Sequence, residues 1–370
     1  MIKKIKNKKL VIFAPFIEEG GIEKNFFILT KYLLRKEIEL LIITWNNKIK
    51  INQDKNLKIL IPNKIFQKIN IRFFKNVISL ITLFFLIIKL KRNCLIFSFH
   101  SNLYVTIISK ILKVKNIIRI AAYGWMFSTI KKKIFHLILK LPSEIIVNSL
   151  EMQSIIMKEF GVNTRCIYNP LNTKEINKLK NDNRKLFKDE KKNLKILFLG
   201  RLVSQKDPLT FLKSLKIIKN IINFEALIVG DGNLKKKLHS YIDKNKLNSK
   251  VKLIGHVYNP VKYLNQCDLL VLTSRFEGLP NVILEAQYLK KFVISTNCKT
   301  GPKEILKDGK IGYLVNQEDY KQLSKAIIYF FKNKKRSVIK EKIKSAYIGT
   351  RRFNYEKNCK KYLDLIEKYL

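Results

Sequence analysis

Two carboxylates in one stretch of the chain have a spacing that suits a ligand-binding site. Glu277 and Glu285 are separated by seven residues in TSRFEGLPNVILEAQ, residues 273–287. Glu285 lies within the apolar run VILEA, where an unpaired charge would be costly. Carboxylates repel phosphates but accept hydrogen bonds from hydroxyl groups. If a nucleotide binds here, we expect both side chains to hold neutral hydroxyls, as on a ribose and a sugar.

Cations that could neutralise the phosphates of such a ligand lie upstream, in GRLVSQKD, residues 200–207. Arg201 and Lys206 follow the apolar run 194–199, which predicts a strand. Both side chains suit phosphate oxygens, Arg as a planar fork and Lys as a compact charge. The alternatives are that these residues are surface cations, and that both Glu residues pair with nearby lysines in so basic a chain.

The elements that carry these residues are predicted to be a strand, a loop and the start of a helix. The apolar run 268–272 is typical of a buried parallel strand, and Pro280 suits the first position of a helix over 280–289. A helix start offers free backbone N–H groups and the positive end of the helix dipole, which favour a phosphate. The backbone expected to bind it belongs to Gly278, Leu279, Pro280 and Asn281.

Both halves of the chain alternate between predicted strands and helices, which indicates parallel sheets with helices on both faces. In the second half, strands are expected over 194–199, 224–229, 251–254, 268–272, 292–295 and 312–315. In the first half, they are expected over 10–15, 38–44, 58–61, 94–99, 116–120, 144–147 and 165–167. The expected fold class is therefore α/β, with two Rossmann-like, doubly wound parallel-sheet domains.

The length of 370 residues suits two domains of about 150 to 180 residues. We expect the first domain over 1–171, followed by a Lys- and Asn-rich linker over 172–193. The second domain is expected over 194–345, and a closing helix is predicted within 346–370.

The chain is strongly basic, with 74 Lys and Arg against 28 Asp and Glu. Nucleic-acid binding is disfavoured, because there is no helix-turn-helix or zinc pattern and the basic residues are spread along the chain. Two explanations of the high content of basic residues remain. One is a bias towards A/T-rich codons, and the other is attraction to anionic lipid, to whose surface basic residues bind. We therefore expect peripheral association with a membrane and no nucleic-acid partner.

The most apolar run, residues 77–88, has the sequence VISLITLFFLII. It is shorter than the roughly 20 residues that a membrane-spanning helix needs. Basic residues flank it on both sides, so it could lie at a membrane surface. A helix packed between the sheet and its neighbours is the alternative.

Cysteine and histidine usage gives no metal or disulfide pattern. The five cysteines are an odd number without a C-x-x-C motif, which predicts a reduced, cytoplasmic protein. With four His and no D-x-D triplet, we expect no cofactor and a metal-independent reaction. Glu18 and Glu19 stand where a signal peptide would have its cleavage site, which favours a first strand instead.

Together, FEGLPNVILE and GRLVSQKD resemble the motifs of retaining glycosyltransferases of the GT-B fold, of the family 4-like type that assembles bacterial capsule, O-antigen and other glycans. The resemblance covers most of the chain and is densest over 195–315. It implies that the two domains face each other across a cleft and that the closing helix crosses back to the first. It also implies that the anomeric configuration is retained, with the leaving phosphate assisting the acceptor.

The resemblance also implies roles for particular residues. Glu285 would hold the ribose, Glu277 would hold a sugar hydroxyl, and Arg201 and Lys206 would stabilise the departing diphosphate. The backbone of Val257 would contact the base. The loop with Gly20 and Gly21, which from its residues alone is equally a plain tight turn, would face the donor.

At one point the sequence departs from the family pattern. Many relatives carry a His after the strand that corresponds to 116–120, where this chain has RIAAYGW. His100, near the end of the neighbouring predicted strand, could substitute for it, although a lone His beside aromatic residues is also typical of a structural role. Arg119 lies near a strand end as well, and Asn169 precedes Pro170 at the crossover. Tyr123, Trp125 and Phe127 could line an acceptor groove or belong to the core.

We therefore expect an enzyme that transfers a hexose or N-acetylhexosamine from a UDP-linked sugar to a lipid-linked or growing surface glycan. Its expected location is the cytoplasmic face of the cell membrane. One alternative is a sugar-nucleotide epimerase of the same fold. Another is a non-catalytic, basic protein that binds membranes or nucleic acid.

Overall fold

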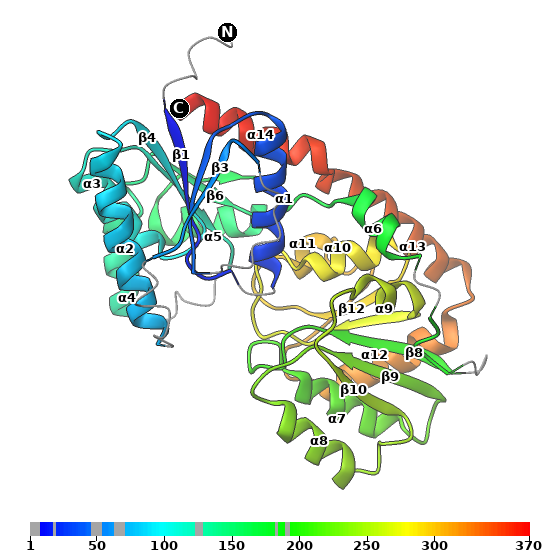
Figure 1. The fold of residues 1–370 in the computed structure, drawn as a ribbon. Coiled ribbons are helices and arrows are strands. Elements are labelled where there is room, and N and C mark those ends of the chain that lie inside the picture. The colour runs from blue at the N-terminus through cyan, green and yellow to red at the C-terminus, as the bar shows by residue number, and fades with distance from the viewer. Residues whose placement is uncertain are drawn as a thin grey trace. The chain divides into compact units, whose positions relative to one another are not determined.

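The computed structural model describes residues 8–17, 20–45, 54–62, 71–122, 129–181, 184–188 and 193–370. The chain forms two compact units (Figure 1). The first comprises Met1–Pro170 together with Glu356–Leu370, and the second comprises Leu171–Tyr355.

The first unit contains a seven-stranded parallel sheet in the order β3-β2-β1-β4-β5-β6-β7. Most of its strand residues are buried, as in sheets covered on both faces. Its strands are β1 (Lys9–Phe13), β2 (Leu40–Ile43), β3 (Leu57–Leu60), β4 (Cys94–Ser98), β5 (Asn116–Ile120), β6 (Glu144–Val147) and β7 (Arg165–Cys166). Its helices are α1 (Gly21–Arg35), α2 (Arg72–Lys89), α3 (Asn102–Ile111), α4 (Thr129–Ile138), α5 (Leu150–Phe160) and α14 (Tyr355–Tyr369).

Helices cover both faces of this first sheet. The register places Val11, Ile96 and Ile118 on one face, where their side chains form cores with residues of α2, α3, α4 and α5. On the opposite face, Phe97 of β4 packs against Tyr362 of α14, with 6.1 Å between ring centroids. The sheet is therefore doubly wound, as the alternation of apolar runs predicts.

The second unit contains a six-stranded parallel sheet in the order β10-β9-β8-β11-β12-β13. Its strands are β8 (Leu194–Leu199), β9 (Phe224–Val229), β10 (Val251–Gly255), β11 (Leu269–Leu272), β12 (Phe292–Thr296) and β13 (Tyr313–Val315). Its helices are α6 (Thr173–Leu179), α7 (Pro208–Ile218), α8 (Lys235–Lys244), α9 (Val261–Gln266), α10 (Asn281–Tyr288), α11 (Pro302–Ile305), α12 (Tyr320–Asn333) and α13 (Ser337–Gly349). A 3₁₀ turn, Thr350–Phe353, precedes α14.

Two local expectations differ from the structure. Pro280 is the N-cap of α10 and has extended backbone, so the helix begins one residue later, at Asn281. The polar segment 172–193 contains a helix, α6, because the Asn172 side chain accepts a hydrogen bond from the Glu175 N–H and caps it. High polarity alone is therefore a poor indicator of irregular structure here.

The predicted fold class is confirmed, since each unit is a Rossmann-like α/β structure built on a parallel sheet. In each sheet the order reverses beside its first strand, between β1 and β4 in the first unit and between β8 and β11 in the second. Ligands of open α/β sheets bind at the carboxyl ends of the strands beside such a reversal. We refer to these two places as the first and second switch points.

Candidate functional site

The second switch point brings together the two loops that carry the predicted cations and the first predicted carboxylate. Neighbouring strands β8 and β11 run parallel, so the loops that follow them leave the same edge of the sheet. These loops are 200–207 and 273–280. Side chains about 70 residues apart in the chain therefore meet at this edge.

Hydrogen bonds join the two loops along their length. The Arg275 N–H donates to the Gln205 carbonyl (2.8 Å), and the Gln205 side chain donates to the Phe276 carbonyl (3.1 Å). The Thr273 hydroxyl is 3.0 Å from the Lys206 carbonyl and 2.8 Å from that of Asp207. These bonds fix the backbone on both sides of the site, so the functional side chains start from constrained positions.

Lys206 and Glu277 form an ion pair in which Lys206 Nζ donates to Glu277 Oε1. Their side chains are only 16% and 7% exposed, so water screens the pair weakly. The Ser274 hydroxyl also donates to Glu277 Oε1, at 2.6 Å. For Glu277, this agrees with the alternative in which both Glu residues pair with nearby lysines, and it also places Lys206 and Glu277 at one edge of the sheet.

A third loop, which follows β12, contacts the backbone of Glu277 and Gly278. The Thr300 hydroxyl donates to the Glu277 carbonyl at 2.5 Å. Gly301 has φ +82°, and a Cβ built on it would lie 1.8 Å from the Gly278 carbonyl oxygen. Only glycine fits this close approach, because any side chain would displace the Gly278 backbone.

Arg201 lies on a tightly packed backbone but has an exposed side chain. A Cβ on Gly230 would lie 1.9 Å from the Gly200 carbonyl oxygen, and the Leu202 N–H donates to the Asp231 carbonyl at 2.8 Å. The Arg201 guanidinium donates to the Gln205 side chain at 3.2 Å. Gln205 thus links Arg201 to the loop that carries Glu277.

The remaining donor-binding predictions in the second unit belong to the segments that follow β10 and β11. Glu285 is the fifth residue of α10 and is 4% exposed, which agrees with its apolar sequence neighbours. Val257 lies in the loop after β10 and is half-buried. In the turn before α10, Gly278, Leu279 and Pro280 are buried, whereas Asn281, the first residue of the helix, is half-buried.

Gly20, Gly21 and His100 belong to the first unit, at its own switch point. Gly20 is the N-cap of α1, and its carbonyl accepts a hydrogen bond from the Lys24 N–H at 3.0 Å. His100 follows β4, and its ring lies edge-on to Phe16 with 6.3 Å between centroids. The loops after β1 and β4 thus meet here, as those after β8 and β11 do in the second unit.

Burial, together with the neighbouring positive charges of Arg72 and Arg119, lowers the pKa of His100 to about 4. The imidazole is therefore neutral at pH 7. Within the described residues, its Nδ1 is buried and has no hydrogen-bond partner. Such a nitrogen can accept or donate one hydrogen bond, depending on the tautomer.

Arg119 is 2% exposed and binds neutral groups of its own unit, so its place near a strand end does not make it a surface ligand. Its Nε donates to the Tyr362 hydroxyl at 3.1 Å, and its Nη2 donates to the Asn169 side chain at 2.7 Å. Arg119 therefore binds both Asn169, where the chain leaves the first unit, and α14, the helix with which it returns.

Sequence reasoning missed Gln205, Ser274 and Thr300, which position the ion pair. Ser274 lies three residues before Glu277, a spacing that offers a weak signal. The contacts of Gln205 and Thr300 join different loops, so nothing in the local sequence indicates them. Tyr123, Trp125 and Phe127, proposed for an acceptor groove, lie outside the described residues.

Buried thiols do not supply a nucleophile near the pair. Burial is the main reason that the pKa of Cys298 is raised to about 12, and Glu277 adds to the effect. All five cysteines are free.

Among the residues described, no cluster of three or more His, Cys, Asp or Glu could hold a metal ion. No helix in the described ranges is both long and apolar enough to cross a membrane.

Residues 180–346 match the family model described as "Glycosyl transferases group 1". The chain is 36% identical over 176 residues to the uncharacterized glycosyltransferase MJ1059 of Methanocaldococcus jannaschii, a match that covers 45% of this chain and 43% of that protein. It is also 36% identical over 140 residues to GalNAc-alpha-(1->4)-GalNAc-alpha-(1->3)-diNAcBac-PP-undecaprenol alpha-1,4-N-acetyl-D-galactosaminyltransferase of Campylobacter jejuni, over 37% of this chain and 38% of that protein. The chain thus spans less than half the length of each relative.

Among solved structures, the chain is similar to Anabaena Alr3699/HepE in complex with UDP-glucose, with a TM-score of 0.76 and 18% identity. The similarity covers 97% of this chain and 99% of that one. At this identity the likeness shows the fold alone, which is the GT-B fold expected from the motifs. The matched family and the named relatives are glycosyltransferases, in agreement with the expected enzyme class.

Proposed function

We propose that this protein is a retaining, family 4-like glycosyltransferase that moves a hexose or N-acetylhexosamine from a UDP-linked sugar to a lipid-linked or growing surface glycan. The observation that carries the proposal is the largely buried Lys206–Glu277 pair at the second switch point, with Arg201 joined to the same loops through Gln205. Cations and a carboxylate at one strand edge suit a ligand with both phosphates and hydroxyls.

The ion pair explains how a carboxylate can lie beside a diphosphate. An isolated Glu277 would repel the phosphates, but Lys206 offsets its charge. The ammonium group has three donors, so Lys206 can hold Glu277 and a phosphate oxygen at once. Glu277 keeps a second oxygen, which we assign to a hydroxyl of the transferred sugar.

Transition-state stabilisation is assigned to the two cations. Negative charge grows on the diphosphate as the bond to the anomeric carbon breaks, and Lys206 and Arg201 would offset it without a metal ion. Backbone N–H groups before and within the first turn of α10 add the positive end of a helix dipole. No side chain is assigned as a covalent nucleophile. From the resemblance to retaining transferases, we propose that the leaving phosphate assists the acceptor.

The remaining roles concern recognition. We assign Glu285 to the ribose hydroxyls and the backbone of Val257 to the base. In the first unit, Gly20 and Gly21 would let the backbone approach the donor closely. His100 is neutral, and its Nδ1 has no partner among the residues that the structure describes, so it would exchange a hydrogen bond with a sugar or acceptor hydroxyl.

Named relatives support the choice of donor and acceptor. The Campylobacter jejuni relative is named for an N-acetylgalactosaminyl transfer to a saccharide on PP-undecaprenol, and the Anabaena structure contains UDP-glucose. A lipid-linked acceptor would require the enzyme at a membrane surface. We therefore propose a peripheral location on the inner face of the cell membrane.

The test is a melting-temperature panel of UDP-, GDP- and ADP-sugars with the full chain, followed by an assay of UDP release with and without acceptor. We expect UDP-sugars to raise the melting temperature, because a ligand at 100 times its Kd stabilises a protein by about 2.7 kcal/mol. Arg201→Ala and Glu285→Gln should each lower transfer about 100-fold or more.

Glu225→Gln is the matched control, since Glu225 is a 3% exposed carboxylate on β9 that pairs with Lys252 instead. It should leave transfer unchanged. Isomerisation of the donor in the absence of acceptor would instead indicate an epimerase, and no response to any sugar nucleotide would overturn the proposal.

A further inference from the structure

Helix α2 exposes several large apolar side chains and buries a polar one. Phe73 and Phe85 are 68% and 64% exposed, whereas Ser79 is fully buried. The Ser79 hydroxyl donates to the Lys75 carbonyl and accepts from the Trp45 indole, both at 2.8 Å. A helix that faces water normally shows the opposite arrangement.

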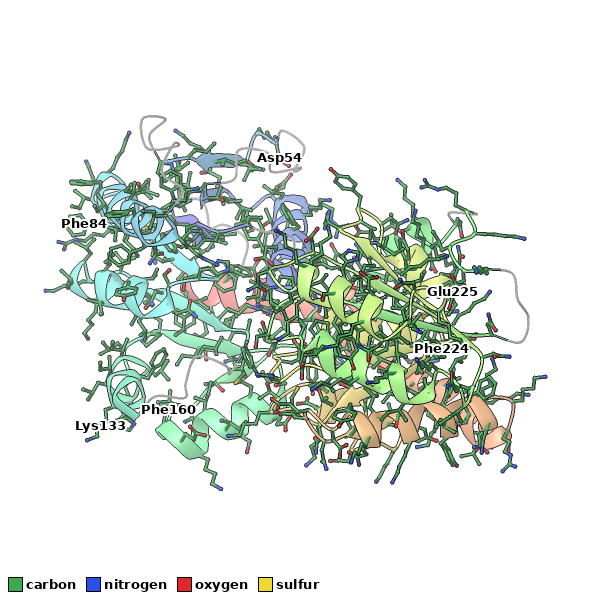
Figure 2. All side chains as sticks on the ribbon, turned by 90° about the horizontal axis from the view of Figure 1, so that it is seen from below. Asp54, Phe84, Lys133, Phe160, Phe224 and Glu225 are labelled. Carbon is green, nitrogen blue, oxygen red and sulfur yellow. The ribbon has the colours of Figure 1, made fainter. Side chains whose placement is uncertain are left out.

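The exposed residues of α2 form a stripe at helical spacing, which the neighbouring helices extend. The stripe consists of Phe73, Val77, Ile81, Phe85 and Ile88. On α3, Tyr104 and Ile111 are exposed, and on α4 so is Leu137. The register of the first sheet places α2, α3 and α4 on one face, and Phe84 and Lys133 lie along the same side of this unit (Figure 2). We call this surface the α2–α4 apolar face.

A groove of about 540 Å³ runs between α2 and α3 within this face. Its lining includes Phe84 and Phe85 from α2 and Tyr104 and Ile108 from α3. Exposed apolar patches of this kind mark surfaces that bind a protein, a ligand or a membrane. In the run 77–88, Leu83 and Ile87 pack in the core, as the alternative of a helix packed against the sheet expects, while Ile81 and Phe85 face outward.

The charge of this segment selects among possible occupants. The 89 residues between Asp54 and Glu144 contain 17 Lys or Arg and no Asp or Glu. The basic residues are spread along the chain as expected, but the acidic ones are absent from the whole region that builds the α2–α4 apolar face. Basic residues stand at both ends of α2, with Arg72 and Lys75 in its first turn and Lys89 and Lys91 at its end.

We propose that the α2–α4 apolar face docks on an anionic lipid bilayer. Its aromatic and aliphatic side chains enter the boundary between headgroups and acyl chains, and its Lys and Arg residues contact the anionic headgroups. This deepens the proposed function by naming the surface that meets the membrane. It uses no catalytic residue, so it can be tested apart from catalysis.

Two properties favour a bilayer over a second copy of this chain. A symmetric dimer through this face would place two acid-free, basic segments against each other, and like charges repel. Anionic lipids would neutralise the same charges. No helix of the described residues is suited to span a membrane, so the face would lie on the bilayer surface.

The experiment is flotation of the full chain with vesicles of equal phosphatidylglycerol and phosphatidylcholine, and with vesicles of phosphatidylcholine alone. We expect binding to the anionic vesicles that weakens as salt rises. Phe73→Ser with Phe85→Ser should lower bound protein at least tenfold. Ile221→Ser with Val338→Ser is the matched control, because these residues are 56% and 54% exposed in the second unit, and it should bind like the parent.

Equal vesicle binding by parent, test and control variants would overturn the proposal, as would a parent that binds no vesicles. So would a parent that is dimeric by light scattering and becomes monomeric in the test variant. Melting temperatures verify folding, and Ile111→Ser with Leu137→Ser on α3 and α4 offers a second test variant with the same expected loss. UDP-sugar thermal shifts should be unchanged in both test variants, so failure here is distinguishable from failure of the proposed transferase.

Discussion

The two switch points have the same topology but differ in how completely their polar groups are satisfied. In the second unit, hydrogen bonds between loops surround the Lys206–Glu277 pair. In the first unit, and within the residues described there, His100 Nδ1 and one Arg119 nitrogen are buried without a hydrogen-bond partner. Topologically equivalent positions in the two units therefore differ in how many of their buried polar atoms already have hydrogen-bond partners.

The difference has a chemical cause in the loops themselves. Those after β8, β11 and β12 supply Gln, Ser, Thr and Glu side chains, which can donate or accept across a narrow gap. The loop after β4 lies in the segment that contains no acidic residue. A charged, constrained site suits a ligand group that is the same in every substrate, such as a diphosphate. Buried polar groups without a partner can instead form hydrogen bonds with a bound molecule.

The largest expected effect comes from the ion pair of the second switch point. Lys206→Met should lower kcat/KM for UDP release by a factor of about 100 to 1,000, because the Lys206 charge that offsets the negative diphosphate is lost and Glu277 is left buried without its partner. Steady-state kinetics with the best UDP-sugar measures this. Lys252→Met, which breaks the pair with Glu225, controls for loss of a lysine pair.

A smaller effect is expected from the loop that supports this pair. Gly301→Ala should lower the free energy of unfolding by about 1 to 3 kcal/mol, because φ is +82° and the new Cβ would collide with the Gly278 carbonyl. It should also reduce donor affinity by moving Gly278. Urea denaturation and UDP-sugar titration measure the two effects.

Gly161→Ala is the control for backbone strain alone, since Gly161 has φ +60° but no atom within 4 Å of the added Cβ. It should cost about 1 kcal/mol and leave donor affinity unchanged. Equal losses in the two variants would show that the close contact of Gly301 with Gly278 has no special importance.

The smallest effect tests the first switch point through pH. The pKa of His100 is about 4 when folded and 6.5 at its ordinary value, so the unfolded chain binds the proton more readily. The contribution of neutral His100 to the free energy of unfolding is fully present above pH 6.5 and is lost as the pH falls from 6.5 towards 4. Between pH 7 and pH 5 the free energy of unfolding should fall by up to about 2 kcal/mol from this group.

His100→Phe should flatten this part of the pH profile, as measured by urea denaturation at several pH values. His256→Phe is the control, because His256 is exposed. An unchanged profile in His100→Phe would mean that His100 is well solvated, and the contrast between the two switch points would then be weaker than we describe.

The secondary structure followed from the sequence wherever a short apolar run was bounded by turn residues. β5, β6, β8 and β9 have the expected bounds, because buried parallel strands are built from short runs in which apolar side chains predominate. The helix α6 was missed because its stabilising cap, from Asn172 to Glu175, is a local hydrogen bond in a polar run without apolar periodicity.

Local sequence alone determined which segments become strands and helices, and it identified Arg201, Lys206, Glu277 and Glu285 as candidates from residue type and spacing. The order of the strands decided that Lys206 and Glu277 meet, since their loops become neighbours only when β8 pairs with β11. Packing likewise decided that Arg119 is buried between Asn169 and Tyr362, and that α2 turns Phe73 and Phe85 outward. The physical reason is that apolar periodicity is a property of neighbouring residues, whereas charge pairing and exposure depend on residues that are distant in the chain.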